Sequence, residues 1–432
     1  MMPTGDAPLT YAQQLLLQLE RGRPGRVLSD RFTVREAYQV SGEVEPEVLR
    51  RALDDVVARH GALRTVLVER ERQRVLDPMP ARLAVHDLPS PSTVDEFVAR
   101  LDGMAYPWDA PPLLHAHLGR FADGTAVLVL VAPHVAADAW SLRVLARDLA
   151  HAYTARLAGT ATLDGRVMQY RDIAEHDHSA SWEATIAQAL PYWRERLGDA
   201  ADLGLAVGPW DRPGSTAVAR FEIGDPVWQA LRTVARRART TPFTLLLTAY
   251  VGTLFPDAGA ALVPVLTAGR IRSEWDTVGF LINALWLRVD LPDNDDRAAL
   301  HQRVDRACRD AYAHDIPLLR VLGVAPAIAA ALAMPGANGR VWPAFQFIPR
   351  VDLPDTVADP ALRLTPVPEG QQVARPVPLP LLWTVRPEDG VYGYVSYDSE
   401  LFDADWVAGR IAAYLALLAQ LANGFPPPAP SS

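Results

Sequence analysis

The feature of this sequence that most constrains its fold is an uninterrupted apolar run at residues 126–131, which reads AVLVLV. Successive side chains of a strand point to opposite faces of the sheet, so this run makes a strand that is apolar on both faces. Such a strand is stable where other elements cover both faces, as in the middle of a sheet packed between helices. The run therefore predicts a central strand and an α/β fold.

The rest of the first half alternates between helical and strand-like patterns. The turn at 122–124 is expected to pair the strand before it with the apolar run. Helices are predicted at residues 10–22, 45–60, 94–105 and 141–155, the last with Ser141 as its N-cap, and strands at 28–40, 63–68 and 113–121.

The second half repeats this alternation, and 432 residues are too many for one ordinary core, so we expect two domains. We place the boundary near residue 178, which gives an N-terminal lobe of residues 1–178, a C-terminal lobe of residues 179–425 and a proline-rich tail at 426–432. Two α/β halves of similar content favour a pseudo-dimer with a ligand site in the cleft between them. The second half is predicted to contain helices at 169–193, 227–239, 242–254 and 405–422, strands at 221–223, 262–266, 285–287, 345–348, 379–385 and 392–397, and an irregular connector at 208–214.

The charge of the chain excludes several classes of function. Its formal net charge is -9, whereas a nucleic-acid surface needs clustered positive charge. The basic residues are all arginine, so chemistry based on lysine, such as a Schiff base or a P-loop, is excluded as well. Local arginine patches remain available to an acidic partner protein.

Other features of the sequence predict a cytoplasmic monomer with no membrane segment. There is no run of about 18 apolar residues of the kind that crosses a bilayer. The N-terminus lacks the basic and apolar regions of a secretory signal. The lone cysteine, Cys308, has no partner for an internal disulfide, which suits a reducing compartment.

The segment 132–141, APHVAADAWS, is the best candidate for a catalytic site. His134 follows the predicted central strand, Asp138 comes four residues later, and a helix begins at once. The ends of strands in parallel sheets point their side chains into clefts, and an imidazole exchanges a proton near neutral pH. Asp138 can brace the turn or orient the ring, and the helix N-terminus favours a nearby negative charge. By itself this spacing is a weak signal.

Taken with segments from the whole chain, this segment resembles the HHxxxDGxS signature of nonribosomal peptide synthetase condensation domains. The order and spacing of the other matching segments agree with the family over nearly all of the sequence. These are PLTYAQQ at 8–14 for SxAQ, RHGALRT at 59–65 for RHExLRT, YRDIA at 170–174 for YxDYA, VGFLINALWLR at 278–288 for IGxFVNTLPLR, AYAHDIP at 311–317 for AYxHQDxP with one residue fewer, and 345–346 and 396–403 for the last motifs.

The resemblance implies a fold and a set of partners. Two lobes, each like chloramphenicol acetyltransferase, would form a V-shaped pseudo-dimer with a central tunnel. Donor and acceptor would enter the tunnel from opposite faces and meet at His134. A floor loop at about 267–288 and a crossover at about 371–380 would belong to the C-terminal lobe. Substrates would be carried on the phosphopantetheine of an acyl or peptidyl carrier protein, and the chain would need no cofactor or metal of its own.

The motif carries over residue by residue. His134 matches the second histidine and, with Asp138, is the expected catalytic pair, although the favoured interpretation of Asp138 is a structural ion pair with an arginine. Pro133 replaces the first histidine, a position that is usually structural. Ala139 replaces the glycine after the aspartate, which adds a methyl group beside the ring.

Further residues are expected around this pair. Trp140, Ser141 and Ala139 are predicted to touch the substrate, and Asn283 of the floor loop is compatible with a substrate contact or a structural role. Arg64 and Arg288 are the candidate partners of Asp138. His115 and His117 alternate on one strand, but no third ligand with convincing spacing supports a metal site.

Three functions remain open from the sequence. The first is a condensation enzyme that joins a carrier-bound acyl or peptidyl thioester to an amine or hydroxyl acceptor. The second is a non-catalytic platform that recruits a carrier protein or a tailoring enzyme, suggested by Pro133 and Ala139. The third is a free-standing acyltransferase that forms an ester on a lipid or polyketide alcohol. Relatives that recruit oxygenases usually lack the second histidine, which is retained here as His134.

Overall fold

The computed structural model divides the chain into two compact units. It describes residues 5–22, 24–89, 92–160, 163, 166–207, 216–256, 258–292, 296–333, 339–348, 357–359, 361–367, 379–388 and 390–424. Unit 1 comprises Met1–Thr185, Ala268–Ile282 and Val351–Pro376, and unit 2 comprises Ile186–Thr267, Asn283–Arg350 and Val377–Ser432.

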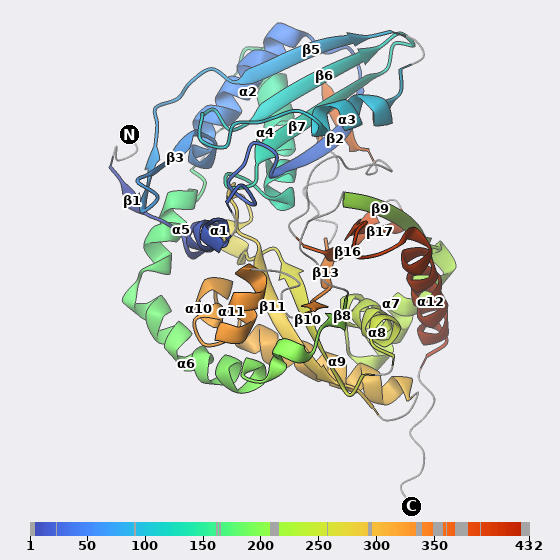
Figure 1. Cartoon of the computed structure of the whole chain (residues 1–432). Helices are drawn as coiled ribbons and strands as arrows, with labels where there is room; N and C mark the ends of the chain where they lie inside the picture. The colour runs from blue at the N-terminus through green and yellow to red at the C-terminus, as the bar shows by residue number, and fades with distance from the viewer. Residues whose placement is uncertain are drawn as a thin grey trace, which may run out of the picture. The chain divides into compact units, whose positions relative to one another are not determined.

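Unit 1 is built on a six-stranded sheet with the order β14-β15-β2-β7-β6-β5 (Figure 1). The apolar run lies in β7, an interior strand, as predicted. β7 is antiparallel to both of its neighbours, so the prediction that His134 follows a strand of a parallel sheet is wrong. The strands are β2 (Thr33–Ser41), β5 (Arg82–Leu88), β6 (His115–Phe121), β7 (Ala126–Pro133), β14 (Val357–Asp359) and β15 (Leu362–Pro366).

Both faces of this sheet are covered, which is what the composition of β7 requires. Leu130 and its even-numbered neighbours pack into the larger apolar cluster, which also holds residues of α2 and α4. Val129 and its odd-numbered neighbours pack into a second cluster with Phe97 of α3. Unit 1 also contains α1 (Tyr11–Gly22), α2 (Pro46–Arg59), α3 (Val94–Asp102), α4 (Ala139–Ala158), α5 (Tyr170–Asp177) and a small sheet of β1 (Ala7–Pro8), β4 (Arg72–Val75) and β3 (Thr65–Val68).

Unit 2 has a six-stranded sheet with the order β11-β10-β13-β16-β17-β9. Helices α8 and α12 pack against each other, and α9 packs against β11 (Figure 1). The strands are β9 (Thr216–Ile223), β10 (Ala260–Thr267), β11 (Asn283–Asp290), β13 (Ala344–Phe347), β16 (Leu381–Glu388) and β17 (Gly390–Asp398), with a two-stranded β8 (Leu205–Ala206) and β12 (Arg340–Val341). The helices are α6 (Ala180–Leu197), which begins in unit 1, α7 (Asp225–Ala238), α8 (Pro242–Leu254), α9 (Arg297–Ala313), α10 (Leu318–Leu322), α11 (Pro326–Ala333) and α12 (Ala404–Ala422).

The structure confirms the α/β class and corrects several boundaries. The strand predicted at 28–40 begins only at Thr33, and α9 and β5 lie in segments for which no element was predicted. Asp138, not Ser141, is the N-cap of α4. The connector at 208–214, the tail at 426–432 and residues 371–378 of the crossover lie outside the described residues.

The division into units also differs from the predicted lobes of residues 1–178 and 179–425. The segments Ala268–Ile282 and Val351–Pro376, predicted in the C-terminal lobe, belong to unit 1. The physical reason is pairing: β15 extends the unit 1 sheet beside β2, and Arg270 forms an ion pair with Asp138. The V shape and the tunnel stay predictions.

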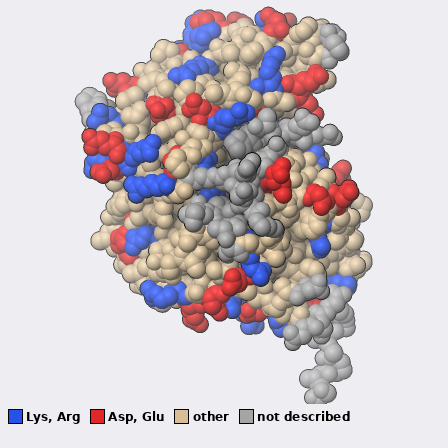
Figure 2. Space-filling model, in the orientation of Figure 1, with Lys and Arg blue, Asp and Glu red and all other residues tan. Residues whose placement is uncertain are grey.

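The surface carries charges of both signs. Figure 2 shows arginine and acidic side chains interspersed over the viewed face. Among the residues that the structure describes, no helix is both long enough and apolar enough to span a bilayer.

Candidate active site

His134 lies directly after β7, where the chain leaves the unit 1 sheet. Its backbone N–H donates to the carbonyl of Phe32 at 2.9 Å, which continues the pairing of β7 with β2. The imidazole contacts two aromatic rings: the centroid of Phe32 lies 4.8 Å away at 32° and that of Phe280 lies 5.0 Å away at 83°. The side chain of His134 is half-buried, so it is held by packing and still partly exposed.

One contact identifies the nitrogen of His134 that carries the proton. Nδ1 lies 2.8 Å from the carbonyl oxygen of Ala137. Since a carbonyl oxygen only accepts, Nδ1 donates, and in the neutral ring Nε2 carries the lone pair. An imidazole in this state can take a proton at Nε2 from a neighbouring group.

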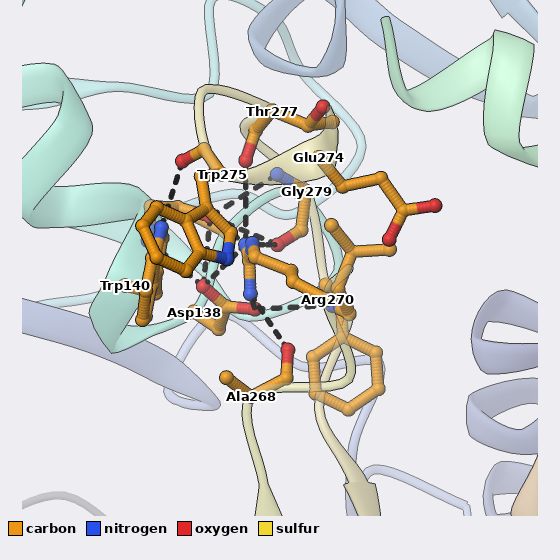
Figure 3. A network of polar contacts seen from close by, with 12 residues as sticks. Asp138, Trp140, Ala268, Arg270, Glu274, Trp275, Thr277 and Gly279 are labelled. Carbon is orange, nitrogen blue, oxygen red and sulfur yellow. Dashed lines mark hydrogen bonds and ion pairs between the residues drawn. The ribbon is translucent and has the colours of Figure 1, made fainter. Parts of the chain in front are cut away.

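Asp138 is buried, and the protein itself engages both of its carboxylate oxygens (Figure 3). Oδ1 accepts from the backbone N–H of Ser141 at 2.8 Å, which caps α4, and from Arg270 Nη2 at 2.9 Å. Oδ2 accepts from Arg270 Nη1 at 2.7 Å and from the backbone N–H of Leu281 at 3.1 Å. With 1% of its surface exposed, Asp138 holds the turn after His134 and the loop at 268–282 rather than a substrate.

The partner of Asp138 is Arg270, so the prediction of Arg64 or Arg288 is wrong. The Arg270 side chain is fully buried and also donates to the carbonyl of Ala268 at 2.9 Å. Burial by itself raises the pKa of Asp138, but the charge and hydrogen bonds of Arg270 outweigh it and hold the pKa below its usual value. The carboxylate therefore stays ionised.

The two arginines that were predicted in this place have structural roles elsewhere. Arg64 donates to the carbonyls of Val57 at 2.9 Å and Ala58 at 3.0 Å, so it holds the end of α2. Arg288, in unit 2, forms an ion pair with Asp199. Each therefore contacts a part of the fold away from Asp138.

Residues 268–282, which lie within the predicted floor loop of about 267–288, are fixed to α4 through Ser141. The Ser141 hydroxyl lies 2.9 Å from the carbonyl oxygen of Gly279 and accepts from the Gly279 N–H at 3.1 Å. Ser141 is fully buried, so its predicted contact with substrate is replaced by this structural role. Trp140 Nε1 donates to the carbonyl of Trp275 at 2.8 Å, which ties the loop to α4 a second time (Figure 3).

Tyr170 forms a hydrogen bond with the backbone of the segment 268–282. The Tyr170 hydroxyl donates to the carbonyl of Phe280 at 2.7 Å and therefore accepts from Thr10 Oγ1 at 3.0 Å. A Cβ at Gly279 would lie 2.5 Å from the Tyr170 ring, so only glycine lets the loop approach this closely. The motifs at 8–14, 170–174 and 278–288 thus meet in one cluster beside His134.

The remaining predicted residues lie as follows. Pro133 ends β7 and is buried, which agrees with its structural role. Ala139 and Trp140 are half-buried in the first turn of α4, where a substrate contact stays a prediction. Asn283 belongs to unit 2, where its Nδ2 donates to Asp315 at 2.7 Å and its Oδ1 accepts from the N–H of Leu318 at 2.9 Å. These contacts favour the structural interpretation of Asn283.

The sequence analysis did not identify three residues that contact His134 or Asp138, namely Arg270, Phe32 and Phe280. Arg270 lies only three residues beyond the predicted start of the floor loop, and a buried aspartate needs a cation somewhere. That argument limits the type of partner but not its position, because 42 arginines were available. Among the described residues, no group of three histidine, cysteine or acidic side chains is placed to hold a metal ion.

Comparison with known proteins gives a consistent result. The family model described as "Condensation domain" matches residues 4–322. The chain is 35% identical over 332 residues to the probable nonribosomal peptide synthetase CymA of Salinispora arenicola, covering 72% of this chain and 4% of CymA. It is 30% identical over 426 residues to the phosphinothricin tripeptide synthetase PhsB of Streptomyces viridochromogenes, covering 94% of this chain and 35% of PhsB.

A solved structure matches nearly the whole chain. SgcC5 from Streptomyces globisporus, in complex with (R)-(-)-1-(2-naphthyl)-1,2-ethanediol and sucrose, superposes with a TM-score of 0.84 at 29% identity. The match covers 96% of this chain and 98% of SgcC5. The chain thus spans 4% of the length of CymA and 35% of that of PhsB, the curated relatives named above.

Proposed function

The chain belongs to the condensation-domain family, and from this membership we propose that it joins a carrier-bound acyl or peptidyl thioester to an amine or hydroxyl acceptor, with His134 as its catalytic residue. The observation that carries the proposal is the imidazole of His134. It belongs to the motif that resembles the family signature, is partly exposed, and donates a hydrogen bond through Nδ1, which supports Nε2 as the proton acceptor.

In the proposed reaction the acceptor nitrogen or oxygen attacks the thioester carbonyl. A C–N or C–O bond forms and the C–S bond breaks. Nε2 of His134 takes the proton from the attacking group and returns it to the departing thiolate, which leaves as the thiol of the carrier's phosphopantetheine. Because the thioester is already activated, the proposed role of the chain is to orient the two substrates and to transfer the proton, without a cofactor of its own.

Asp138 and Arg270 support this step without contacting the substrate. Their ion pair fixes the first turn of α4 on one side of His134 and the floor loop on the other. We propose that both are positioning residues, and that Ala139, which was predicted to touch the substrate, lines the space beside the ring. The carrier protein is the proposed partner, since the family acts on carrier-bound substrates.

The SgcC5 complex supports hydroxyl acceptors as well as amines. That protein is matched over nearly its whole length, and its structure was solved with a diol. A hydroxyl differs from an amine only in the attacking atom, so the same imidazole at position 134 serves both. We therefore propose that the acceptor is either an alcohol, such as a diol, or an amine, such as an amino acid.

The decisive experiment measures product from acyl-loaded carrier protein and a panel of amine and hydroxyl acceptors. His134→Ala is expected to lower kcat about 10²- to 10⁴-fold, the usual contribution of a general base. His134→Gln keeps a hydrogen-bonding side chain without basicity, so partial activity in this variant means that positioning contributes more than proton transfer. Equal yields from wild type and His134→Ala, with unchanged melting temperatures, would falsify the catalytic assignment.

The recruitment platform is the second candidate, because Pro133 and Ala139 depart from the motif. It predicts that the wild type binds carrier protein or a tailoring enzyme and releases no product from any loaded carrier. The retained His134, with its defined hydrogen bond to Ala137, favours the catalytic function.

A further inference from the structure

Phe280 connects the floor loop to the ring of His134. The two rings lie 5.0 Å apart, edge-to-face at 83°, and Phe280 is 8% exposed. In the segment VGFLIN it occupies the place that the family motif IGxFVN leaves open. We propose that Phe280 is a positioning residue for His134, which holds the imidazole so that Nε2 points to the acceptor; the inference rests on the proposed function of His134.

The backbone of Phe280 is anchored independently of its side chain. Its carbonyl accepts from Tyr170, and the N–H groups on either side, of Gly279 and Leu281, donate to Ser141 and Asp138. These three hydrogen bonds measure 2.7, 3.1 and 3.1 Å. Because its backbone is anchored in this way, the Phe280 ring has little freedom to move with the imidazole and limits the movement of His134.

The imidazole of His134 also contacts the ring of Phe32. The two rings are tilted by 32°, with their centroids 4.8 Å apart. The hydrogen bond from Nδ1 to Ala137 holds one edge of the ring, and the contacts with the Phe32 and Phe280 rings restrict its rotation. Because misplacement of a catalytic group by about 1 Å can cost roughly 100-fold in rate, this restriction bears on turnover.

The contact predicts a specific effect of removing the ring while keeping an apolar side chain. Phe280→Leu is expected to lower kcat about 10-fold or more with little change in KM for the loaded carrier protein, because binding does not depend on the imidazole's orientation. Phe280→Tyr keeps the ring and is expected to retain most of the activity. Phe402→Leu is the matched control, since Phe402 is buried to a similar degree, at 6% exposed, in unit 2.

A second measurement makes the test independent of turnover. In protein with isotope-labelled histidine, the His134 signals are assigned by their absence from His134→Ala. Wild type and Phe280→Tyr are expected to show the Nδ1–H tautomer alone, and Phe280→Leu an average of two tautomers.

The outcomes separate the two proposals. If Phe280→Leu matches Phe402→Leu in kcat and matches the wild type in its His134 signals, the positioning role is overturned. Absence of product from the wild type counts against the proposed function, whereas the imidazole signals of Phe280→Leu still decide whether Phe280 orients the ring.

Discussion

Asp138 in unit 1 is fully buried and Asp315 in unit 2 is half-buried, and the pKa values of these two carboxyl groups are shifted in opposite directions. Asp138 is paired with Arg270, which keeps its pKa below the usual value. Asp315 accepts a hydrogen bond from the neutral amide of Asn283, and burial raises its pKa to about 6. Among the described residues no arginine forms an ion pair with Asp315.

The opposite pKa shifts of Asp138 and Asp315 follow from their different partners. The ionised Asp138 accepts from the N–H groups of Ser141 and Leu281 and from the Arg270 guanidinium, and so joins α4 to a loop that is distant in sequence. Asp315 and Asn283 connect two parts of unit 2 through a hydrogen bond in which the donor is a neutral amide. The fully buried Asp138 is thus paired with a cation, whereas the partner of Asp315 is an uncharged amide.

The strongest test of this comparison removes the cation. Arg270→Met leaves Asp138 charged and unpaired, so the free energy of unfolding should fall by about 3–5 kcal/mol in urea denaturation. The double variant Arg270→Met with Asp138→Asn should recover part of that loss, since no lone charge remains. Arg309→Met, which removes an exposed ion pair with Asp305, is the control and should change stability by less than about 1 kcal/mol.

A contrary result would be informative. If Arg270→Met alone stays within about 1 kcal/mol of the wild type, Asp138 does not depend on its counter-charge and the contrast with Asp315 has no energetic basis.

A second test asks whether the Asp138 region depends on packing as well as charge. Gly279→Ala forces a methyl group against the Tyr170 ring, so we expect a loss of about 1–3 kcal/mol in unfolding free energy. Gly409→Ala is the same change inside α12, where a Cβ meets nothing within 4 Å, and should stabilise by about 0.5–1 kcal/mol. Effects of the same sign at both positions would mean that contact with Tyr170 does not limit the loop.

The smallest expected change in unfolding free energy is at Asp315, where the substitution should stabilise the protein. Its pKa is raised to about 6 in the folded protein, so the proton is held more tightly than in the unfolded chain, and the resulting stability is lost as pH rises through about 6. Asp315→Asn cannot ionise and should be about 1–2 kcal/mol more stable than wild type near pH 8, with the difference fading near pH 4. Unfolding free energies measured at both pH values check this, and a difference independent of pH would contradict it.

The sequence predicted the elements whose signal is local. The doubly apolar β7, the amphipathic α2 and the apolar α8 were found because each shows its own period or composition. Helix α9 was missed because its charged residues obscure a buried stripe of Leu300, Val304, Cys308 and Ala311, spaced by three and four residues.

The candidate site was predicted as far as the motif reaches. His134 and the ion pair of Asp138 followed from the resemblance and from the need of a buried carboxylate for a cation. Arg270 and Phe280 were not identified, because a contact between residues more than 130 positions apart leaves no local trace. The assignment of Ser141 as N-cap failed for a smaller reason: both Asp138 and Ser141 are good caps, and the aspartate lies one turn earlier.

Unit 1 is completed by a loop that the chain delivers only after it has built part of unit 2. A fragment ending at residue 185 would therefore contain Asp138 in an apolar interior without its guanidinium, and such a fragment should aggregate or stay unfolded when it is expressed alone. Exchange of unit 1 between relatives would succeed only if residues 268–282 and 351–376 are transferred together with the first 185, because a contiguous stretch of the gene does not encode the whole unit.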